Sequence, residues 1–344
     1  MQDNKYLLYK LNNIEGFGTK TINIILDRIK IKNKTLDEFF NITEKDFCDL
    51  FPEFGKGRFS KVNYDSLFNF NDEIIEKEYN RLIENGIKII TLFDNEYPKI
   101  IIKKFENAPP PILFCKGKIS LLNANSVAIV GSRDVDIIGL GATKKIAKHL
   151  AENGYNVVSG YAKGVDTNAH LGALECDGTT TAVLSCGINQ IPIKKEIQEN
   201  YNWENDLLLV SQFKPNEPWS ARNAMIRNKL VCALSKAVVV ILSGPEKDQN
   251  GKMSGTFDAG KTALKFGIPL LVLSPKFFSF ESKGNIQLIK MGAKEITDCQ
   301  KVAELIKSDV IYPSVVYSRR LKYCKQYDNS QTHPSDPHPT AGTV

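Results

Sequence analysis

The sequence predicts an α/β protein, with a doubly wound, mostly parallel sheet covered by helices on both faces and preceded by a small all-helical domain. Three observations support this fold class. From Ser126 onward, short apolar segments without polar alternation are each followed by an amphipathic segment. Before residue 84, apolar residues recur instead at the three- and four-residue spacing of helices. Hydrophobic residues make up 42% of the 344 residues and charged residues 24%, which is ordinary for a folded domain.

Residues 1–83 are predicted to form a domain of short helices. The helical segments are 6–14, 19–31, 35–42 and 72–86, the last with Gly86 as its C-terminal cap. Between the first two, Gly16, Phe17 and Gly18 have the form of a helix-hairpin-helix turn. Glycines in such a turn bring backbone N–H groups to a phosphate, which makes it a secondary DNA contact. A Gly-rich turn between packed helices explains the same residues equally well.

Residues 84–310 are predicted to form the α/β domain. It opens with segments 88–94 and 107–117, whose β-branched and aromatic residues between Pro, Gly and Asp predict strands. The buried strands that follow are expected at 126–131, 156–160, 180–187, 206–212, 237–244 and 269–275. The helices between them are expected at 140–154, 165–178, 226–235 and 256–267. A last unit at 285–307 closes the domain.

Composition and charge restrict the function classes. The net charge of +6 favours a polyanionic partner, although a lysine-rich surface also serves solubility. No segment is long and apolar enough to insert into a membrane, and the N-terminus lacks the pattern of a secretory signal. Seven cysteines without close pairing or metal-ligand spacing predict buried thiols in a reducing cytoplasm and no metal site. Residues 311–344 are polar and proline-rich, and are predicted to be a disordered tail.

The candidate site begins where the strand at 126–131 runs into Gly131, Ser132 and Arg133. Ligands of doubly wound sheets bind beyond the carboxyl ends of the strands. Exposed amides at a helix N-terminus bind anions, and a guanidinium beside them adds two-pronged recognition of a phosphate diester. The alternative is an arginine that caps a neighbouring strand or pairs with an acid. No nicotinamide or flavin cofactor is expected, because the Gly-x-Gly-x-x-Gly pattern is missing.

Two further segments bring polar groups to the same edge of the sheet. Gly160 and Lys163 follow the second strand, and the glycine lets the backbone approach a ligand. Arg227, Asn228 and Lys229 are expected just before an apolar helix, where a solvated helix start explains them as well. The polar, glycine-containing loop 243–260 is expected to move over this site.

Asp166 and His170 are four residues apart, so both are expected on one face of a helix. As an acid–base pair they would support hydrolysis. We favour structural roles, with Asp166 capping the helix and His170 holding a loop, because no nucleophile or metal ligand accompanies them.

Taken together and in order, these motifs resemble the DNA-processing protein A family, also called Smf. The segments that carry the resemblance are FDNEYPKI, PPPILFCKG, VAIVGSR, VVSGYAKGVDTNAHLGAL, TTAVLSCGI, IRNKLVCALSKAVVVI and SGTFDAGKTAL. The resemblance covers about residues 5–275. It implies an extended Rossmann-like domain, preceded by a SAM/helix-hairpin-helix-like helical domain.

The resemblance also implies a function. Members bind single-stranded DNA without base specificity, need no catalysis or cofactor, help a RecA-type recombinase to load during DNA uptake, and commonly form homodimers. Carried over by position, the phosphate pocket would be lined by Gly131, Ser132, Arg133, Gly160, Lys163, Arg227, Asn228 and Lys229. The usual Arg-Asn-Arg reads Arg-Asn-Lys here, which keeps the charge and loses the planar fork at Lys229.

A second interpretation is an enzyme related to the lysine-decarboxylase-like nucleotide phosphoribohydrolases, a group with a similar fold. Met225, Arg227 and Lys229 loosely match their Met-x-x-Arg-Lys, and 255–258 partly match their Gly-Thr-x-x-Glu. In that enzyme Arg227 would hold the phosphate and Asp258 would stabilise a cationic sugar. A third interpretation, a nucleotide sensor in a defence system, uses the same pocket with another ligand.

Overall fold

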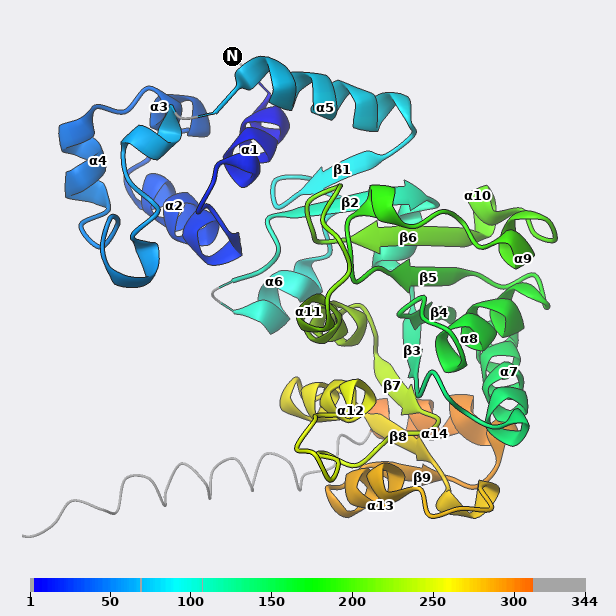
Figure 1. The fold of residues 1–344 in the computed structure, drawn as a ribbon. Helices are drawn as coiled ribbons and strands as arrows, with labels where there is room; N and C mark the ends of the chain where they lie inside the picture. The colour runs from blue at the N-terminus through cyan, green and yellow to red at the C-terminus, as the bar shows by residue number, and fades with distance from the viewer. Residues whose placement is uncertain (1–2, 69, 107, 312–344) are drawn as a thin grey trace, which may run out of the picture. The chain divides into compact units, whose positions relative to one another are not determined.

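The computed structural model describes residues 3–68, 70–106 and 108–311 (Figure 1). Residues Met1–Ala303 form one compact unit, and Glu304–Val344 are assigned to a second. The predicted disordered tail at 311–344 therefore lies outside the described residues, except for its first residue. Across the described ranges, no helix is both long and apolar enough to cross a membrane.

The N-terminal region consists of short helices, as predicted. They are α1 Asn4–Asn13, α2 Thr19–Ile31, α3 Leu36–Phe40, α4 Glu44–Leu50 and α5 Asp72–Glu84. Side chains cap the starts of all these helices except α2, and at α3 Thr35 and Glu38 form a reciprocal capping box. The sequence did not predict α4, because its seven residues bury only Phe47 and show no apolar period. Gly86 follows α5 with a φ of +74°, as expected of a C-terminal cap.

The described chain then forms one nine-stranded sheet in the order β1-β2-β6-β5-β4-β3-β7-β8-β9. The strands are β1 Lys88–Thr91, β2 Ile112–Gly117, β3 Ser126–Val130, β4 Asn156–Ser159, β5 Thr180–Val183, β6 Leu207–Ser211, β7 Ala237–Val240, β8 Leu270–Leu273 and β9 Lys294–Ile296. β2 runs antiparallel to both of its neighbours, and all other neighbouring strands are parallel. The predicted doubly wound, mostly parallel sheet is confirmed.

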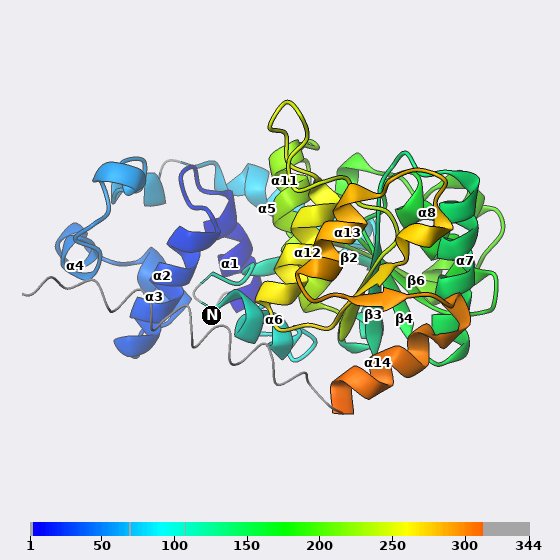
Figure 2. The ribbon, with the colours of Figure 1, turned by 90° about the horizontal axis from the view of Figure 1, so that it is seen from below.

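Helices cover both faces of this sheet, which explains why its central strands are buried along their whole length (Figures 1 and 2). α7 Ile137–Glu152 and α8 Val165–Leu174 pack on one face. α11 Ala221–Ala233, α12 Gly255–Lys265 and α13 Lys283–Lys290 lie on the other face. The remaining helices are α6 Lys99–Phe105, α9 Lys195–Gln198, α10 Trp203–Asp206 and α14 Val302–Ile311.

The topology places a switch point between β3 and β7. From β3 the chain adds β4, β5 and β6 on one side, and it then returns to place β7 on the other side of β3. In open α/β sheets, ligands bind outside the carboxyl ends of the strands at such a reversal. The loops that follow β3, β4 and β7 therefore form the first place to look for a site.

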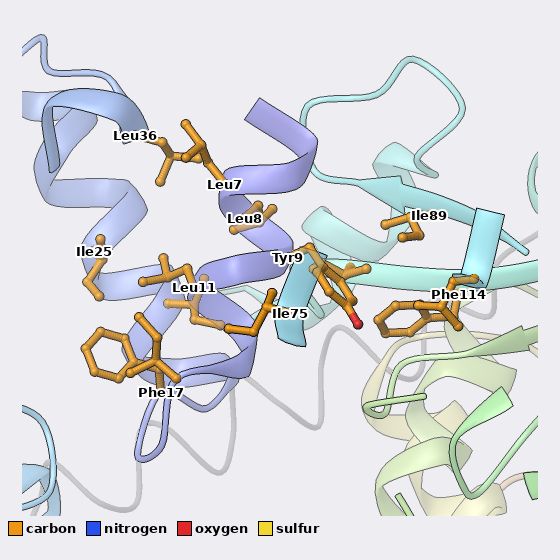
Figure 3. Close-up of a cluster of buried hydrophobic side chains, with 14 of the residues drawn as sticks. Leu7, Leu8, Tyr9, Leu11, Phe17, Ile25, Leu36, Ile75, Ile89 and Phe114 are labelled. Atoms are coloured by element: carbon orange, nitrogen blue, oxygen red, sulfur yellow. The ribbon is translucent and has the colours of Figure 1, made fainter. Parts of the chain in front are cut away.

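The N-terminal helices and the sheet share one hydrophobic cluster (Figure 3). Tyr9 of α1 and Phe114 of β2 are both buried, with ring centroids 6.2 Å apart in an edge-to-face arrangement. Leu82 and Ile87, on either side of the predicted boundary at residue 83, belong to the same cluster. Both sides of that boundary therefore contribute to the packing of Met1–Ala303.

The cysteines of the described residues are free thiols, and not all of them are buried as the sequence predicted. The buried ones are Cys115, Cys186, Cys232 and Cys299. Cys176 is half-buried, and Cys48 is exposed on α4 because its neighbour Phe47 occupies the inward-facing position.

Candidate functional site

The two loops predicted to hold a ligand meet beyond the carboxyl ends of β3 and β4. Gly164, at the start of α8, has a φ of +73°, and a Cβ there would lie 2.4 Å from the carbonyl oxygen of Arg133. The Val165 N–H points to the carbonyl of Ser132, at 3.4 Å. A Cβ on Gly131 would likewise lie 2.5 Å from the side chain of Val165. These glycines are therefore required for close packing of the two loops.

Arg227 reaches this place from the other face of the sheet. The sequence placed it just before a helix, whereas α11 begins at Ala221 after a Ser220 cap, so Arg227 lies well inside the helix. Its guanidinium lies against Gly160, where a Cβ would be 1.4 Å from Nη1. A residue larger than glycine at position 160 would make this guanidinium shift. Gly160 and Arg227, predicted as separate ligands, thus form one structural unit.

The Arg227 side chain is a buried cation that forms no ion pair within the described part of the chain. It is 7% exposed, its Nε has no hydrogen-bond partner, and no ion pair of Arg227 occurs among the described residues. Burial lowers its pKa, while the nearby Asp166 carboxyl raises it and Arg133 lowers it further. A buried charge without a partner is costly, and an anion placed beside it removes that cost. Arg227 is therefore a candidate ligand for an anion.

Asp166 does not neutralise this cation by direct contact. Its carboxylate accepts a hydrogen bond from the Ala162 N–H at 3.2 Å, and burial raises the pKa of the carboxyl while Arg227 lowers it. The positive charge at the strand ends is therefore only partly balanced by the protein's own acid.

The sequence predicted that the turn after β3 exposes backbone amides at a helix N-terminus, and the structure differs from this prediction. The Ser132 N–H donates to the carbonyl of Leu242 at 2.9 Å, and the Ser132 hydroxyl bonds the Asp134 backbone. α7 begins only at Ile137, and its first turn is capped by the Asp136 carboxylate, which accepts from the Gly139 N–H. The turn therefore does not present a free helix N-terminus to a ligand. Its contribution to an anion site is the side chain that follows.

Arg133, the last residue of this turn, is exposed, and its guanidinium lies over the ring of Trp219, 5.4 Å from the centroid. The charge of Arg133 also lowers the pKa of Arg227. Guanidinium groups bind phosphate through paired hydrogen bonds, so one exposed and one buried arginine here suit a phosphate ligand.

Lysines extend the positive charge along the loop after β4. Lys163 is exposed between Gly160 and Gly164. Lys194, which the sequence analysis did not single out, donates to the Ala162 carbonyl at 3.2 Å and to the Thr167 hydroxyl. Burial lowers the pKa of Lys194, Glu196 and Asp166 raise it, and the charge of Lys163 lowers it. The adjacent lysines at 194 and 195, which come after a buried strand, were the sequence pattern from which Lys194 could have been identified as a site residue.

We call Arg133, Gly160, Lys163, Lys194 and Arg227 the strand-end site. It combines four cationic side chains with a glycine that lets one of them approach the backbone. In the part of the chain that the structure describes, no group of three or more His, Cys, Asp or Glu residues could hold a metal ion.

Asn228 and Lys229 face a different neighbour from Arg227. The Asn228 amide donates to the Gly255 carbonyl at 2.9 Å and to the Asp258 carboxylate at 3.2 Å. Lys229 is exposed and, with Asn228, opposes the rise that burial causes in the pKa of Asp258. Consecutive helical residues point in directions about 100° apart, which separates the predicted trio. Asn228 and Lys229 thus lie toward α12.

Arg227 and Asp258, the two residues assigned to the enzyme of the second interpretation, are not bonded to each other in the described structure. Asp258 is bonded to Asn228, and no hydrogen bond or ion pair between Asp258 and Arg227 occurs among the described residues. The charged groups that shift the pKa of Arg227 are Asp166, Arg133 and the Cys232 thiol.

Asp166 and His170 lie on α8, but each has its own partner. The His170 Nδ1 is 2.6 Å from the Thr180 hydroxyl, which itself donates to the Val157 carbonyl, so the imidazole is the donor. Burial lowers the pKa of His170 to about 3, which keeps the ring neutral. The interpretation of His170 as a group that holds the structure by hydrogen bonding is thus favoured over an acid–base pair.

Gly16 and Gly18 form the turn between α1 and α2. Gly16 has a φ of +84°, and a Cβ there would lie 2.9 Å from the carbonyl oxygen of Lys61. The Gly18 N–H donates to the Gly16 carbonyl at 3.1 Å. Close packing against Lys61 therefore accounts for Gly16, and the turn belongs to the N-terminal helices rather than to the strand-end site.

Comparisons with known proteins agree with the resemblance found in the sequence. Residues 88–307 match the model of the family described as DNA recombination-mediator protein A. The DNA processing protein DprA of Streptococcus pneumoniae is 30% identical over 238 residues, which cover 68% of this chain and 78% of that protein. Its X-ray structure superimposes with a TM-score of 0.70 and 26% identity, covering 88% of this chain and 98% of that one.

A second solved structure, of DNA processing protein A from Helicobacter pylori, is 28% identical with a TM-score of 0.52 and covers 65% of this chain and 96% of that one. That structure concerns the single-stranded DNA binding mode of the Helicobacter pylori protein. The match to the family model spans the whole sheet and the strand-end site. This chain belongs to the DNA recombination-mediator protein A family.

Proposed function

We propose that this protein binds single-stranded DNA by its backbone phosphates, without base-specific recognition, at the strand-end site. The observation that carries the proposal is the side chain of Arg227, a buried guanidinium whose Nε has no hydrogen-bond partner and which forms no ion pair among the described residues. A phosphate diester supplies the missing anion and accepts hydrogen bonds from a guanidinium.

The surroundings of Arg227 favour a long polyanion over a single small anion. Arg133 and Lys163 are exposed beside it, so cationic side chains extend from the buried group onto the surface. A polynucleotide presents successive phosphates to such a row, and each contact releases counterions. The Helicobacter pylori relative, whose structure was solved for its single-stranded DNA binding mode, supports the same ligand class.

The wider role follows from family membership and belongs to the same proposal. The protein acts in the cytoplasm as a homodimer, inserts into no membrane, performs no chemical step, and assists loading of a RecA-type recombinase on incoming strands. Co-sedimentation with such a recombinase on single-stranded DNA, with and without this protein, tests the loading role. Equal recombinase occupancy in both samples would contradict it.

The binding proposal is tested by titration with a single strand and, side by side, with a nucleoside monophosphate. We expect micromolar or tighter affinity for the strand, falling with salt by a logarithmic slope of about 0.7 per phosphate contact. Arg133→Ala weakens binding roughly tenfold, whereas Arg81→Ala, an exposed arginine on α5, leaves it unchanged.

One outcome would replace this proposal by the enzyme of the second interpretation. Tight binding of the mononucleotide with release of the free base, abolished by Asp258→Asn, would show cleavage of a glycosidic bond. Absence of salt-sensitive binding to the single strand would contradict the DNA proposal directly.

A further inference from the structure

Trp219 is an exposed aromatic residue at the edge of the strand-end site. It lies in the segment that joins the carboxyl end of β6 to α11, next to the Ser220 cap of that helix. Although tryptophan is a large apolar residue, 52% of its surface is exposed. The loop is therefore arranged so that the indole faces outward beside the cationic groups.

The segment that carries Trp219 is fixed by hydrogen bonds on both sides. The Gly187 N–H donates to the Glu217 carbonyl at 2.7 Å, and the Asn223 amide donates to the Glu217 carboxylate at 2.7 Å. The Ser220 hydroxyl accepts from the Asn223 N–H. An indole held by such a segment loses little conformational freedom when a ligand binds.

Arg133 covers one side of this indole. Its guanidinium lies over the ring, 5.4 Å from the centroid, so about half of the residue is left accessible. The same guanidinium is close enough to Arg227 to affect its protonation. An accessible aromatic face and the buried anion site are therefore connected through Arg133.

We propose that Trp219 is a stacking platform for a nucleobase of the bound strand, placed beside the phosphate held by Arg133 and Arg227. The inference rests on the proposed function and adds a base contact that the phosphate contacts do not require. Bases stack on aromatic side chains irrespective of sequence, since every base has a π face. The platform thus adds affinity for strands that carry bases while leaving binding unspecific for sequence.

The chain contains a matched control for this residue. Trp203, the second of its two tryptophans, also has a cation over its ring, the Lys116 ammonium at 6.0 Å. It lies on α10 at the amino end of β6, opposite to the strand-end site, and is partly buried against the hydrophobic cluster. Trp203→Phe leaves Trp219 as the sole fluorescent indole.

The first measurement is tryptophan fluorescence of the Trp203→Phe protein during titration with a short single strand. Stacking on the indole is expected to quench its emission with the same midpoint as binding measured independently. In the reciprocal variant, Trp219→Phe, the indole emission comes from Trp203. This emission is expected not to be quenched by the strand. Binding without any change in Trp219 emission would overturn the proposal.

The second measurement compares a single strand with a base-free deoxyribose phosphate strand of equal length. The unmodified protein is expected to bind the base-free strand roughly tenfold more weakly, and Trp219→Ala to remove this difference while Trp219→Phe keeps it. Equal affinity of the unmodified protein for both strands would overturn the stacking platform and leave phosphate binding intact.

Two other results would also contradict a proposal. If Trp219→Ala weakens both strands by the same factor, Trp219 only supports Arg133, and the stacking proposal is wrong. If neither strand binds the unmodified protein, the proposed function itself fails, and the platform fails with it.

Discussion

The guanidinium of Arg227 lies so close to the backbone of Gly160 that a Cβ on the glycine would be 1.4 Å from Nη1. The two residues are 67 positions apart in the chain: Gly160 directly follows β4, and Arg227 lies on α11, which covers one face of the sheet. Their contact holds a buried cation, whose Nε has no hydrogen-bond partner, at the carboxyl ends of β3 and β4.

Gly160→Ala is expected to displace the Arg227 guanidinium and to weaken binding of single-stranded DNA roughly tenfold or more, since a charged hydrogen-bonding partner is lost. Gly141→Ala is the control, because no atom lies near a Cβ at this exposed helical position. Its free energy of unfolding should rise by about 0.5–1 kcal/mol, with unchanged affinity. Equal affinity of both variants would contradict the role of the Gly160–Arg227 contact.

Arg227→Met is expected to remove the stabilisation of the fold by DNA. A ligand that binds only the folded protein raises its stability, by about 2.7 kcal/mol at a concentration of 100 times Kd. Thermal unfolding with and without a single strand measures this increase. Lys229→Met, which removes a charge from the same helix on the side of Asp258, should keep it. A persisting shift in Arg227→Met would place the anion elsewhere.

Asn228→Ala is expected to destabilise the fold rather than to weaken DNA binding. Its side chain joins α11 to Gly255 and Asp258 of α12, and loss of such buried hydrogen bonds costs about 1–3 kcal/mol. Urea denaturation gives the loss of stability, and a double-mutant cycle with Asp258→Ala gives the coupling. Weaker binding at unchanged stability would instead support Asn228 as a phosphate ligand.

His170 is expected to make the fold sensitive to mild acid. Its pKa is about 3 in the folded protein and 6.5 in the unfolded chain, so the unfolded state binds the extra proton between these values. The stabilisation is complete above pH 6.5 and falls by about 1.4 kcal/mol per unit as the pH drops toward 3. Denaturation of the wild type and of His170→Asn over this range should show a shallower slope for the variant.

Asp166 acts in the opposite direction, since burial raises the pKa of its carboxyl and the folded protein then takes up the proton first. Its contribution is common to both proteins, so the difference between their curves isolates His170. Parallel curves would mean that the imidazole is protonated in the folded state.

The strand ends were predictable from the sequence because the signal there is local. A buried parallel strand is a short apolar run, and the residue that follows it must lie at the edge of the sheet. Gly131, Arg133, Gly160 and Lys163 were placed correctly for this reason. The start of α11 was predicted too late, because residues 221–224 show no apolar period and the Ser220 cap was not recognised.

Lys194 and Trp219 show why the remainder of the site could not be predicted. Lys194 reaches Ala162 and Thr167 through side-chain contacts between segments about thirty residues apart. Trp219 stands in a polar loop, where nothing local indicates that Arg133 will cover its ring. Contacts of this kind depend on how the two loops approach each other after the sheet has formed.

The sequence by itself determined the order of the strands and of the main helices, the edge of the sheet at which the candidate site lies, and the positive charge found there. These properties follow from periodicity and from the rule that parallel strands end at one edge. Only the tertiary structure decided that Arg227 is separated from Asn228 and Lys229 and placed against Gly160. Side-chain directions on a helix, and the space beside a glycine, are set by packing between distant segments, which no local pattern encodes.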